Sequence, residues 1–180
     1  MVPHWERGDI ESCTILDLKR DLSVLALGGS IATQTNGIIA EVIEVKSFKE
    51  LEDRKEQAKG KIVFFSRALD QSKVNTFAGY GGAVDQRVNG AIEAAKYGAA
   101  GVVIRSITTK HDNVPHTGVM DYNDTIPKIP AAALGNIDVD FLSEELKKNP
   151  HLKINLKLNC KTLQDAQSYN VIGEITGTEF

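Results

Sequence analysis

The sequence predicts an α/β fold, because short apolar runs rich in strand-forming residues alternate with segments of helical periodicity. Residues 61–106 show the alternation most clearly, since KIVFFS (61–66) and AAGVVIRS (99–106) enclose an amphipathic segment. The second run is apolar on both faces, which is typical of a strand covered by helices on both sides. We therefore expect a strand–helix–strand unit at 61–106 to form the best-defined core.

The composition fits one globular domain. Of 180 residues, 42% are apolar, and 21 Lys and Arg against 24 Asp and Glu give a net charge of -3. This balance predicts no nucleic-acid or anionic-membrane surface. No apolar stretch approaches the ~20 residues that cross a bilayer, and no signal peptide is recognisable in this chain. A disordered tail, a membrane protein and a disulfide scaffold are therefore excluded.

The first third of the chain is predicted to form strands followed by one helix. Ser47 and Glu50 form a capping box, in which the hydroxyl and the carboxylate each satisfy a backbone N–H at the start of the helix. The helix is expected to end at Gly60, a residue that readily adopts the left-handed conformation. The strand-forming runs before it are 13–18, 22–27 and 38–45.

A second helix is predicted in the middle of the chain. A glycine-rich loop at 78–82 precedes it, and its apolar side chains lie at helical spacing from Val84 to Ala95. Gly98 is the expected left-handed end of this helix.

The last third is predicted to contain three strands and one helix. A short strand at 131–134 and a helix at about 138–148 come first. Residues 152–160 alternate between apolar and polar side chains, which indicates an antiparallel strand with one wet face and with Cys160 on the buried side. Residues 169–176 are predicted to form one more strand.

A long loop at 107–130, which contains three prolines, carries most of the candidate chemistry. His111 and His116 flank Asp112 there. A zinc site needs three or four converging ligands, and two loop histidines five residues apart do not match the helical H-E-x-x-H spacing. We therefore expect solvated or interface histidines and no metal ligand in this chain.

Two motifs approach known sites without completing them. Residues 28–30 (GGS) begin a G-x-S-x-G nucleophile elbow, but Ala32 replaces its last glycine and no helical pattern follows. The glycines of 79–82 precede a helix but lack the phosphate-binding GK[ST] sequence and an acidic ribose ligand. A tight turn and a flexible connection are the simpler interpretations. No convincing catalytic set is found.

Cys13 and Cys160 lie too far apart in sequence for a zinc or redox motif. They could form a disulfide only if the fold brought the first and last strands together. Separate thiols are the favoured interpretation, and pairing stays open.

Six segments, taken in order, resemble one known family. They are VPHWERG (2–8), LALGGSIATQTNGIIAEVIEV (25–45), GKIVFF (60–65), GAIEAAKYGAAGVVIRS (90–106), PHTGVMDYNDTIPKIPAAAL (115–134) and NVIGEITG (170–177). Together they resemble the protease-associated (PA) domain inserted in plasma glutamate carboxypeptidase-like enzymes, the carboxypeptidase Q family. These enzymes belong to the aminopeptidase-type family of two-zinc exopeptidases. The resemblance covers nearly the whole chain, and its specificity lies in the combination of segments.

The resemblance implies a small β-barrel or sandwich of mixed strands flanked by helices, a choice that periodicity alone leaves open. It implies a single PA domain over 1–180, with a core of about 9–166 and with 1–8 and 167–180 as junctions to an absent peptidase domain. The two zinc ions and the catalytic residues of the family would lie in that peptidase domain. No catalytic or metal-binding residue and no cofactor is therefore expected in this chain.

The implied function is that of a non-catalytic domain of a zinc-dependent exopeptidase acting on dipeptides or small peptides. It would frame the active-site cleft and influence substrate access or protein contacts. We expect His116, Thr117 and Tyr122 to face a substrate or partner. The expected partners are the parent's own peptidase domain, a peptide substrate and a second parent copy in a homodimer, and the parent is expected to be exported to the periplasm or the cell exterior. The alternatives are a free-standing peptide-binding module and a small hydrolase using Ser30.

Overall fold

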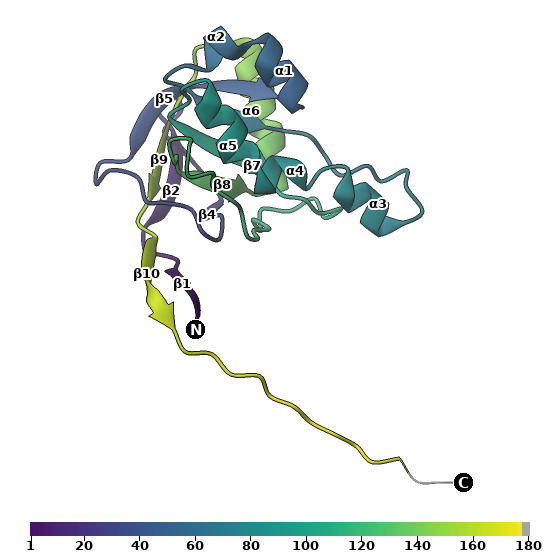
Figure 1. Cartoon of the computed structure of the whole chain (residues 1–180). Helices are drawn as coiled ribbons and strands as arrows, with labels where there is room; N and C mark the ends of the chain where they lie inside the picture. The colour runs from purple at the N-terminus through teal and green to yellow at the C-terminus, as the bar shows by residue number, and fades with distance from the viewer. Residues whose placement is uncertain (178–180) are drawn as a thin grey trace.

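An eight-stranded mixed sheet, nearly closed into a barrel and flanked by helices, forms the body of the computed structural model, which describes residues 1–177 (Figure 1). The α/β class and the expected barrel of mixed strands are therefore confirmed. The order of the strands is β3-β2-β9-β5-β6-β7-β8-β4. Their bounds are β2 Glu11–Ile15, β3 Arg20–Leu22, β4 Val24–Ala26, β5 Ile38–Val45, β6 Ile62–Phe65, β7 Gly101–Arg105, β8 Ala131–Leu134 and β9 Lys153–Leu158.

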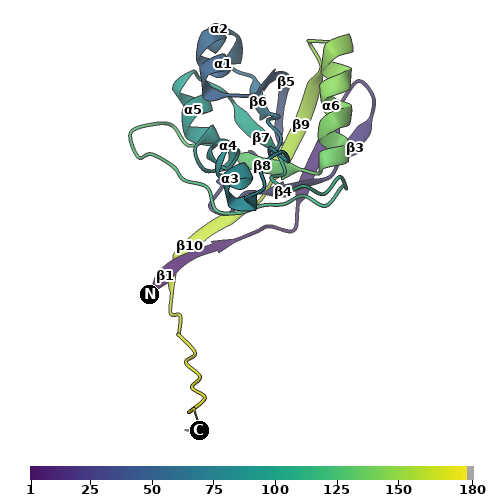
Figure 2. The same cartoon turned by 90° about the vertical axis from the view of Figure 1, so that its right-hand side faces the viewer.

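Strands β5, β6, β7 and β8 run parallel, which confirms the strand–helix–strand unit. Helices α1 (Phe48–Asp53), α2 (Lys55–Ala58) and α5 (Gly90–Lys96) cover one face of these strands, and α6 (Asn136–Lys148) covers the other (Figure 2). Every residue of β6 is buried. Side chains of a strand alternate between its faces, so Phe64 joins the cluster around α6 while Phe65 joins the cluster around α1 and α5.

The predicted helix signals are present. The hydroxyl of Ser47 accepts a hydrogen bond from the N–H of Glu50 at 3.0 Å, and the Glu50 carboxylate accepts one from the N–H of Lys46 at 2.8 Å. Gly60 and Gly98 have φ angles of 71° and 73°, in the left-handed region that favours glycine. The capping box and both glycine ends are therefore confirmed.

The expected strand at 169–176 is wrong. Residues 167–177 carry no strand, and the segment after β9 pairs instead as β10 (Lys161–Ala166) with β1 (Val2–Glu6) in an antiparallel two-stranded ribbon. The apolar residues of 169–176 face solvent. A strand-forming sequence becomes a strand only where a neighbouring strand supplies backbone partners. Within residues 1–177, β1 pairs with β10 and not with 169–176.

Two further expectations need correction. The glycine-rich loop at 78–82 lies mostly within helix α3 (Thr76–Gly81), because the Asn75 side chain caps its N-terminus by accepting from the N–H groups of Phe77 and Ala78. Both predicted helices are interrupted, the first at Arg54 between α1 and α2 and the second between α4 (Asp85–Val88) and α5.

The strand expected at 22–27 is divided into β3 and β4 at Ser23. The N–H of Ser23 donates to the carboxylate of Asp138 at 2.7 Å, so this residue leaves the strand ladder and the chain passes from one end of the sheet order to the other.

Strand β9 pairs antiparallel with both β2 and β5, as its alternation predicted. Cys160 is buried on the core side, and Cys13 is fully buried on β2. Both are free thiols, which confirms the favoured interpretation. No helix within residues 1–177 has the length and apolar character needed to cross a membrane.

Candidate functional site

The 107–130 loop is held against the body by backbone hydrogen bonds. The N–H of Gly28 donates to the carbonyl of Gly118 at 2.9 Å, and the N–H of Met120 donates back to the carbonyl of Gly28 at 2.9 Å. Met120 itself is buried. The middle of the loop therefore extends the sheet beyond the end of β4 and has a defined position.

Tyr122 anchors the loop from inside. Its hydroxyl accepts a hydrogen bond from the N–H of Ile31 at 3.0 Å and donates one to the carbonyl of Ile129 at 2.7 Å. Burial raises the pKa of Tyr122, so the phenol stays protonated and able to donate. The structure thus places Tyr122 in the packing beneath the loop.

His116 and Thr117 lie nearer the surface. The N–H of His116 donates to the hydroxyl of Ser106 at 2.7 Å, so the backbone is fixed while the imidazole is exposed. The hydroxyl of Thr117 accepts from the guanidinium of Arg7 at 3.4 Å, and Arg7 also donates to the carbonyl of Ala26 at 2.8 Å. The loop therefore meets the residue that follows β1.

His111 lies apart from His116, against α6. Its Nε2 is 2.9 Å from Oδ2 of Asp140, and Arg105 donates to Oδ1 of the same carboxylate at 2.7 Å. Partial burial acts to raise the pKa of Asp140, but the hydrogen bonds from Arg105 and His111 outweigh it and hold this pKa below its ordinary value. Within residues 1–177, no group of three or more His, Cys, Asp or Glu could hold a metal ion.

Ser30 is fully buried. Its hydroxyl accepts from the N–H of Ala131 at 2.9 Å and donates to the carbonyl of Ile31 at 3.0 Å, while the indole of Trp5 donates to its carbonyl at 2.9 Å. A serine nucleophile needs an adjacent base and access to substrate. This geometry fits the simpler interpretation of a structural turn.

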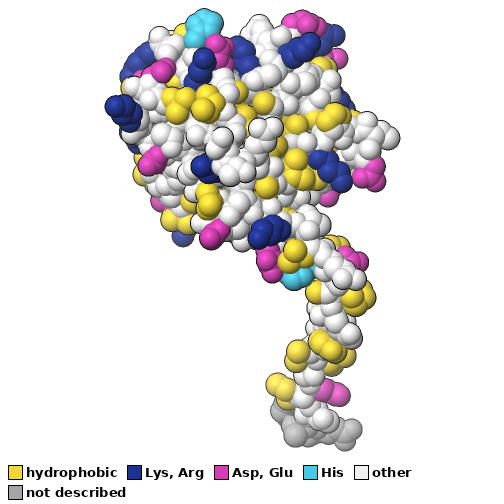
Figure 3. Space-filling model, turned by 90° about the vertical axis from the view of Figure 1, so that its left-hand side faces the viewer, with side chains coloured by type: hydrophobic (Ala, Val, Ile, Leu, Met, Phe, Trp, Pro, Cys, Tyr) yellow, Lys and Arg dark blue, Asp and Glu magenta, His cyan; other side chains and the backbone are white. Residues whose placement is uncertain are grey.

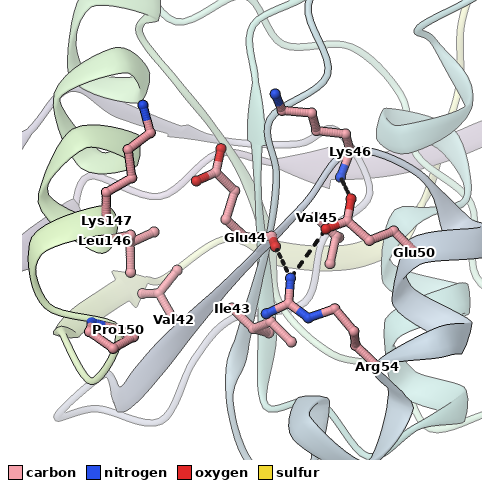
Figure 4. Close-up of a pocket in the computed structure, with 10 residues that line it drawn as sticks. All are labelled: Val42, Ile43, Glu44, Val45, Lys46, Glu50, Arg54, Leu146, Lys147 and Pro150. Carbon is pink, nitrogen blue, oxygen red and sulfur yellow. Dashed lines mark hydrogen bonds and ion pairs between the residues drawn. The ribbon is translucent and has the colours of Figure 1, made fainter.

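A shallow groove of about 420 Å³ runs along the end of β5, between α6 and the α1–α2 pair (Figure 4). Arg54 crosses it, donating to the carbonyl of Glu44 at 2.8 Å and to the carboxylate of Glu50 at 3.2 Å. A second pocket of about 360 Å³ adjoins it at the ends of β6 and β7, where Ser66, Arg67 and Arg105 lie. None of these three residues belongs to the candidate sites that the sequence motifs predict.

A signal for them exists in the sequence. Ser66 and Arg67 are the first two residues after the run KIVFF, and Arg105 directly follows the run GVVI; both runs form parallel strands. Because the carboxyl ends of parallel strands share one edge of a sheet, such residues converge there.

Comparison with known proteins gives clear relatives. No protein-family model matches the chain. Carboxypeptidase Q of Xenopus laevis is 42% identical over 179 residues, and carboxypeptidase Q of Homo sapiens is 39% identical over 180 residues. Each alignment covers 99% of this chain and 36% of the relative. The chain therefore spans little more than a third of the length of the curated relatives it matches.

Solved structures agree with this result. The Peptidase M28 precursor of Shewanella amazonensis superposes with a TM-score of 0.84 at 36% identity, over 90% of this chain and 36% of that one. A zinc aminopeptidase of Bacillus subtilis gives a TM-score of 0.55 at 21% identity, over 92% and 32% of the two chains. The second likeness shows a shared fold alone.

Proposed function

Because this chain is a homologue of one segment of carboxypeptidase Q, we propose that it is the non-catalytic protease-associated domain of a zinc-dependent exopeptidase. In this role it frames the active-site cleft and influences which dipeptides or small peptides enter. The observation that carries the proposal is the alignment of 99% of the chain with 36% of a longer carboxypeptidase. The superposition on the M28 peptidase precursor supports it.

The β1–β10 ribbon supports an insertion into a peptidase domain. Val2 pairs with Ala166 and Trp5 with Thr162, so the chain enters and leaves the body side by side (Figure 1). Such a pairing suits a domain inserted between two parts of another domain. The proposed core is about 9–166, and 1–8 and 167–180 are the proposed junctions.

Exposed apolar side chains along 169–175 support contact with that peptidase domain. The segment that leaves the body carries separate hydrophobic side chains along its length (Figure 3). In the proposed parent, contact with the peptidase domain would remove these apolar side chains from water. The side chains, with their exposed fractions, are Tyr169 (79%), Val171 (98%), Ile172 (90%) and Ile175 (98%).

In the proposed domain, the 107–130 loop faces the cleft or a subunit of a parent homodimer. His116 and Thr117 are the proposed contacts, since both lie toward the surface. Tyr122 is the third proposed residue of this face, and its two hydrogen bonds would hold the loop in the shape that presents the other two.

The zinc ions of the proposed enzyme would be bound by the peptidase domain. The described part of this chain offers no cluster of metal ligands, so its proposed contribution is to binding and access. Metal analysis should find two zinc ions in each molecule of the parent enzyme. It should find no zinc retained by this chain when the chain is purified alone. Zinc bound tightly by the chain alone would contradict this assignment. Export of the parent is part of the same proposal.

The test of the access role uses the intact parent enzyme. His116→Ala and Thr117→Ala should change the ratio of kcat/KM values between dipeptides by about threefold or more, because they alter differential binding. Asp124→Asn is the matched control, since its side chain lies on the same loop and is 97% exposed. Unchanged ratios for both alanine variants would reject the assignment of this loop.

A second test separates the domain from a self-sufficient hydrolase. The purified chain is incubated with zinc and a dipeptide panel, and no turnover is expected. Appreciable turnover that Ser30→Ala abolishes would favour the hydrolase alternative. Micromolar peptide binding without turnover would favour a free-standing peptide-binding module.

A further inference from the structure

The pocket at the carboxyl ends of β5, β6 and β7 has the position of a ligand site. Its volume is about 360 Å³, and Lys46, Ser66 and Arg105 line it from the ends of the three strands. In sheets built from parallel strands, ligands commonly bind beyond these ends. The opposite wall is the side of α6.

Two adjacent donors of this pocket lack partners. Ser66 is 6% exposed, and its hydroxyl has no hydrogen-bond partner among the described residues. The Nε atom of Arg67 is likewise buried and without a partner there. An arginine N–H can only donate, and leaving a buried donor unpaired is unfavourable. The guanidinium is held in place through its Nη2, which contacts the carboxylate of Asp85.

The acidic side chains of the same pocket are already engaged. The pairs are Ser143 with Glu44 at 2.8 Å, Arg105 with Asp140 at 2.7 Å and Lys147 with Glu144 at 2.6 Å. Among the residues that line the pocket, the buried polar atoms without a partner are the hydroxyl oxygen of Ser66 and the Nε atom of Arg67. A ligand with several acceptor oxygens can accept a hydrogen bond from both.

We propose that this pocket binds a small oxyanion, with the hydroxyl of Ser66 and the Nε of Arg67 as hydrogen-bond donors and Lys46 as an added positive charge. Figure 4 shows Lys46 at the end of β5 and Lys147 on α6 projecting toward the same side, with Glu44 between them. The oxyanion is either the carboxylate of a peptide or amino acid or a free inorganic anion. The site does not depend on the role of the 107–130 loop.

The experiment is a calorimetric titration of the full chain at constant ionic strength. The probes are inorganic phosphate, a glycyl dipeptide and the C-terminal amide of that dipeptide. Saturable binding of phosphate or of the dipeptide is expected, with the amide binding about tenfold more weakly than the dipeptide or not at all. Binding of phosphate alone identifies an inorganic anion, and discrimination between dipeptide and amide identifies a carboxylate.

Variants then locate the site. Ser66→Ala and Arg67→Gln should each weaken binding about tenfold, because each removes a hydrogen bond to a charged ligand. Lys153→Gln, on the exposed side of β9, is the control and should leave binding unchanged. If Arg67→Gln fails to fold by circular dichroism, Arg67→Lys keeps the charge but removes the Nε donor and should still weaken binding. Absence of saturable binding, or binding that Ser66→Ala and the folded Arg67 variant leave intact, would overturn the proposal.

Discussion

The hydroxyl of Tyr122 accepts a hydrogen bond from the backbone N–H of Ile31 at 3.0 Å, across 91 residues of sequence. The same hydroxyl donates to the carbonyl of Ile129 at 2.7 Å, so one phenol closes the loop and joins it to the segment after β4. The loop is therefore ordered by a side chain that points inward.

Tyr122→Phe should lower the free energy of unfolding by about 1–3 kcal/mol, because it keeps the ring but leaves two backbone groups without their partner. Urea denaturation followed by circular dichroism measures the change. Tyr169→Phe is the matched control, since Tyr169 is 79% exposed, and it should change stability by no more than about 0.5 kcal/mol. Equal effects of the two substitutions would show that the Tyr122 hydroxyl does not hold the loop.

Asp138 connects the start of α6 to the β3–β4 corner. It is buried, and it accepts from the N–H of Ser23 at 2.7 Å and from Arg20 at 3.1 Å. Asp138→Ala should lower the free energy of unfolding by about 2–4 kcal/mol, since it removes the acceptor of the Ser23 N–H and the buried partner of Arg20. Thermal or urea unfolding provides the measurement.

Glu144→Ala is the control on the same helix, because this side chain is 61% exposed and pairs only with an exposed lysine. Its effect should stay below about 1 kcal/mol. A loss for Asp138→Ala as small as that would mean that the corner does not depend on the buried carboxylate.

The parallel core could be predicted because its sequence signal is local. A strand that is covered on both faces of its sheet is a continuous apolar run in the sequence, and β6 and β7 are such strands. The alternation that sends Phe64 to one cluster and Phe65 to the other follows directly from strand geometry. Helix ends could be predicted for the same reason, because a capping residue such as Ser47 acts within one turn of the helix.

The β1–β10 ribbon could not be predicted from the same patterns. Five of the six residues of β10 are exposed, so the strand has no buried face to produce a periodic signal. It exists through backbone pairing with a segment about 160 residues earlier, as between Trp5 and Thr162. The inward position of Tyr122 could not be predicted for the same reason, since its hydrogen-bond partner Ile31 is distant in sequence.

Because of Asp140, the free energy of unfolding should depend measurably on pH in the acid range. Partial burial acts to raise its pKa, but hydrogen bonds from Arg105 and His111 lower it more, so the folded pKa lies below the ordinary value of about 3.9. A lowered carboxyl pKa contributes stability above the unfolded pKa, and this contribution is lost as the pH falls toward and through the folded pKa. Its size should be under about 1 kcal/mol, because the carboxylate is 48% exposed.

The comparison of wild type with Asp140→Asn isolates this contribution. The difference in unfolding free energy between the two proteins should be present at about pH 5 and should shrink below about pH 4. A difference that stays the same down to about pH 3 would show that Arg105 and His111 do not stabilise the charged form of Asp140.

The two cysteines should not react with thiol reagents in the folded chain. Burial raises the pKa of the Cys13 thiol to about 12, and the nearby charges of Asp138 and Asp21 act in the same direction. Burial also raises the pKa of Cys160, which is 4% exposed. Since the thiolate is the reactive form, a chromogenic disulfide reagent at about pH 8 should detect no thiol in the native chain and both thiols in denaturant.

The Cys160→Ser variant allows the Cys13 thiol to be followed alone. The reaction of Cys13 should proceed only at the rate of unfolding. Rapid labelling of Cys13 in the folded variant would mean that β2 opens locally and that the core around it is not closed.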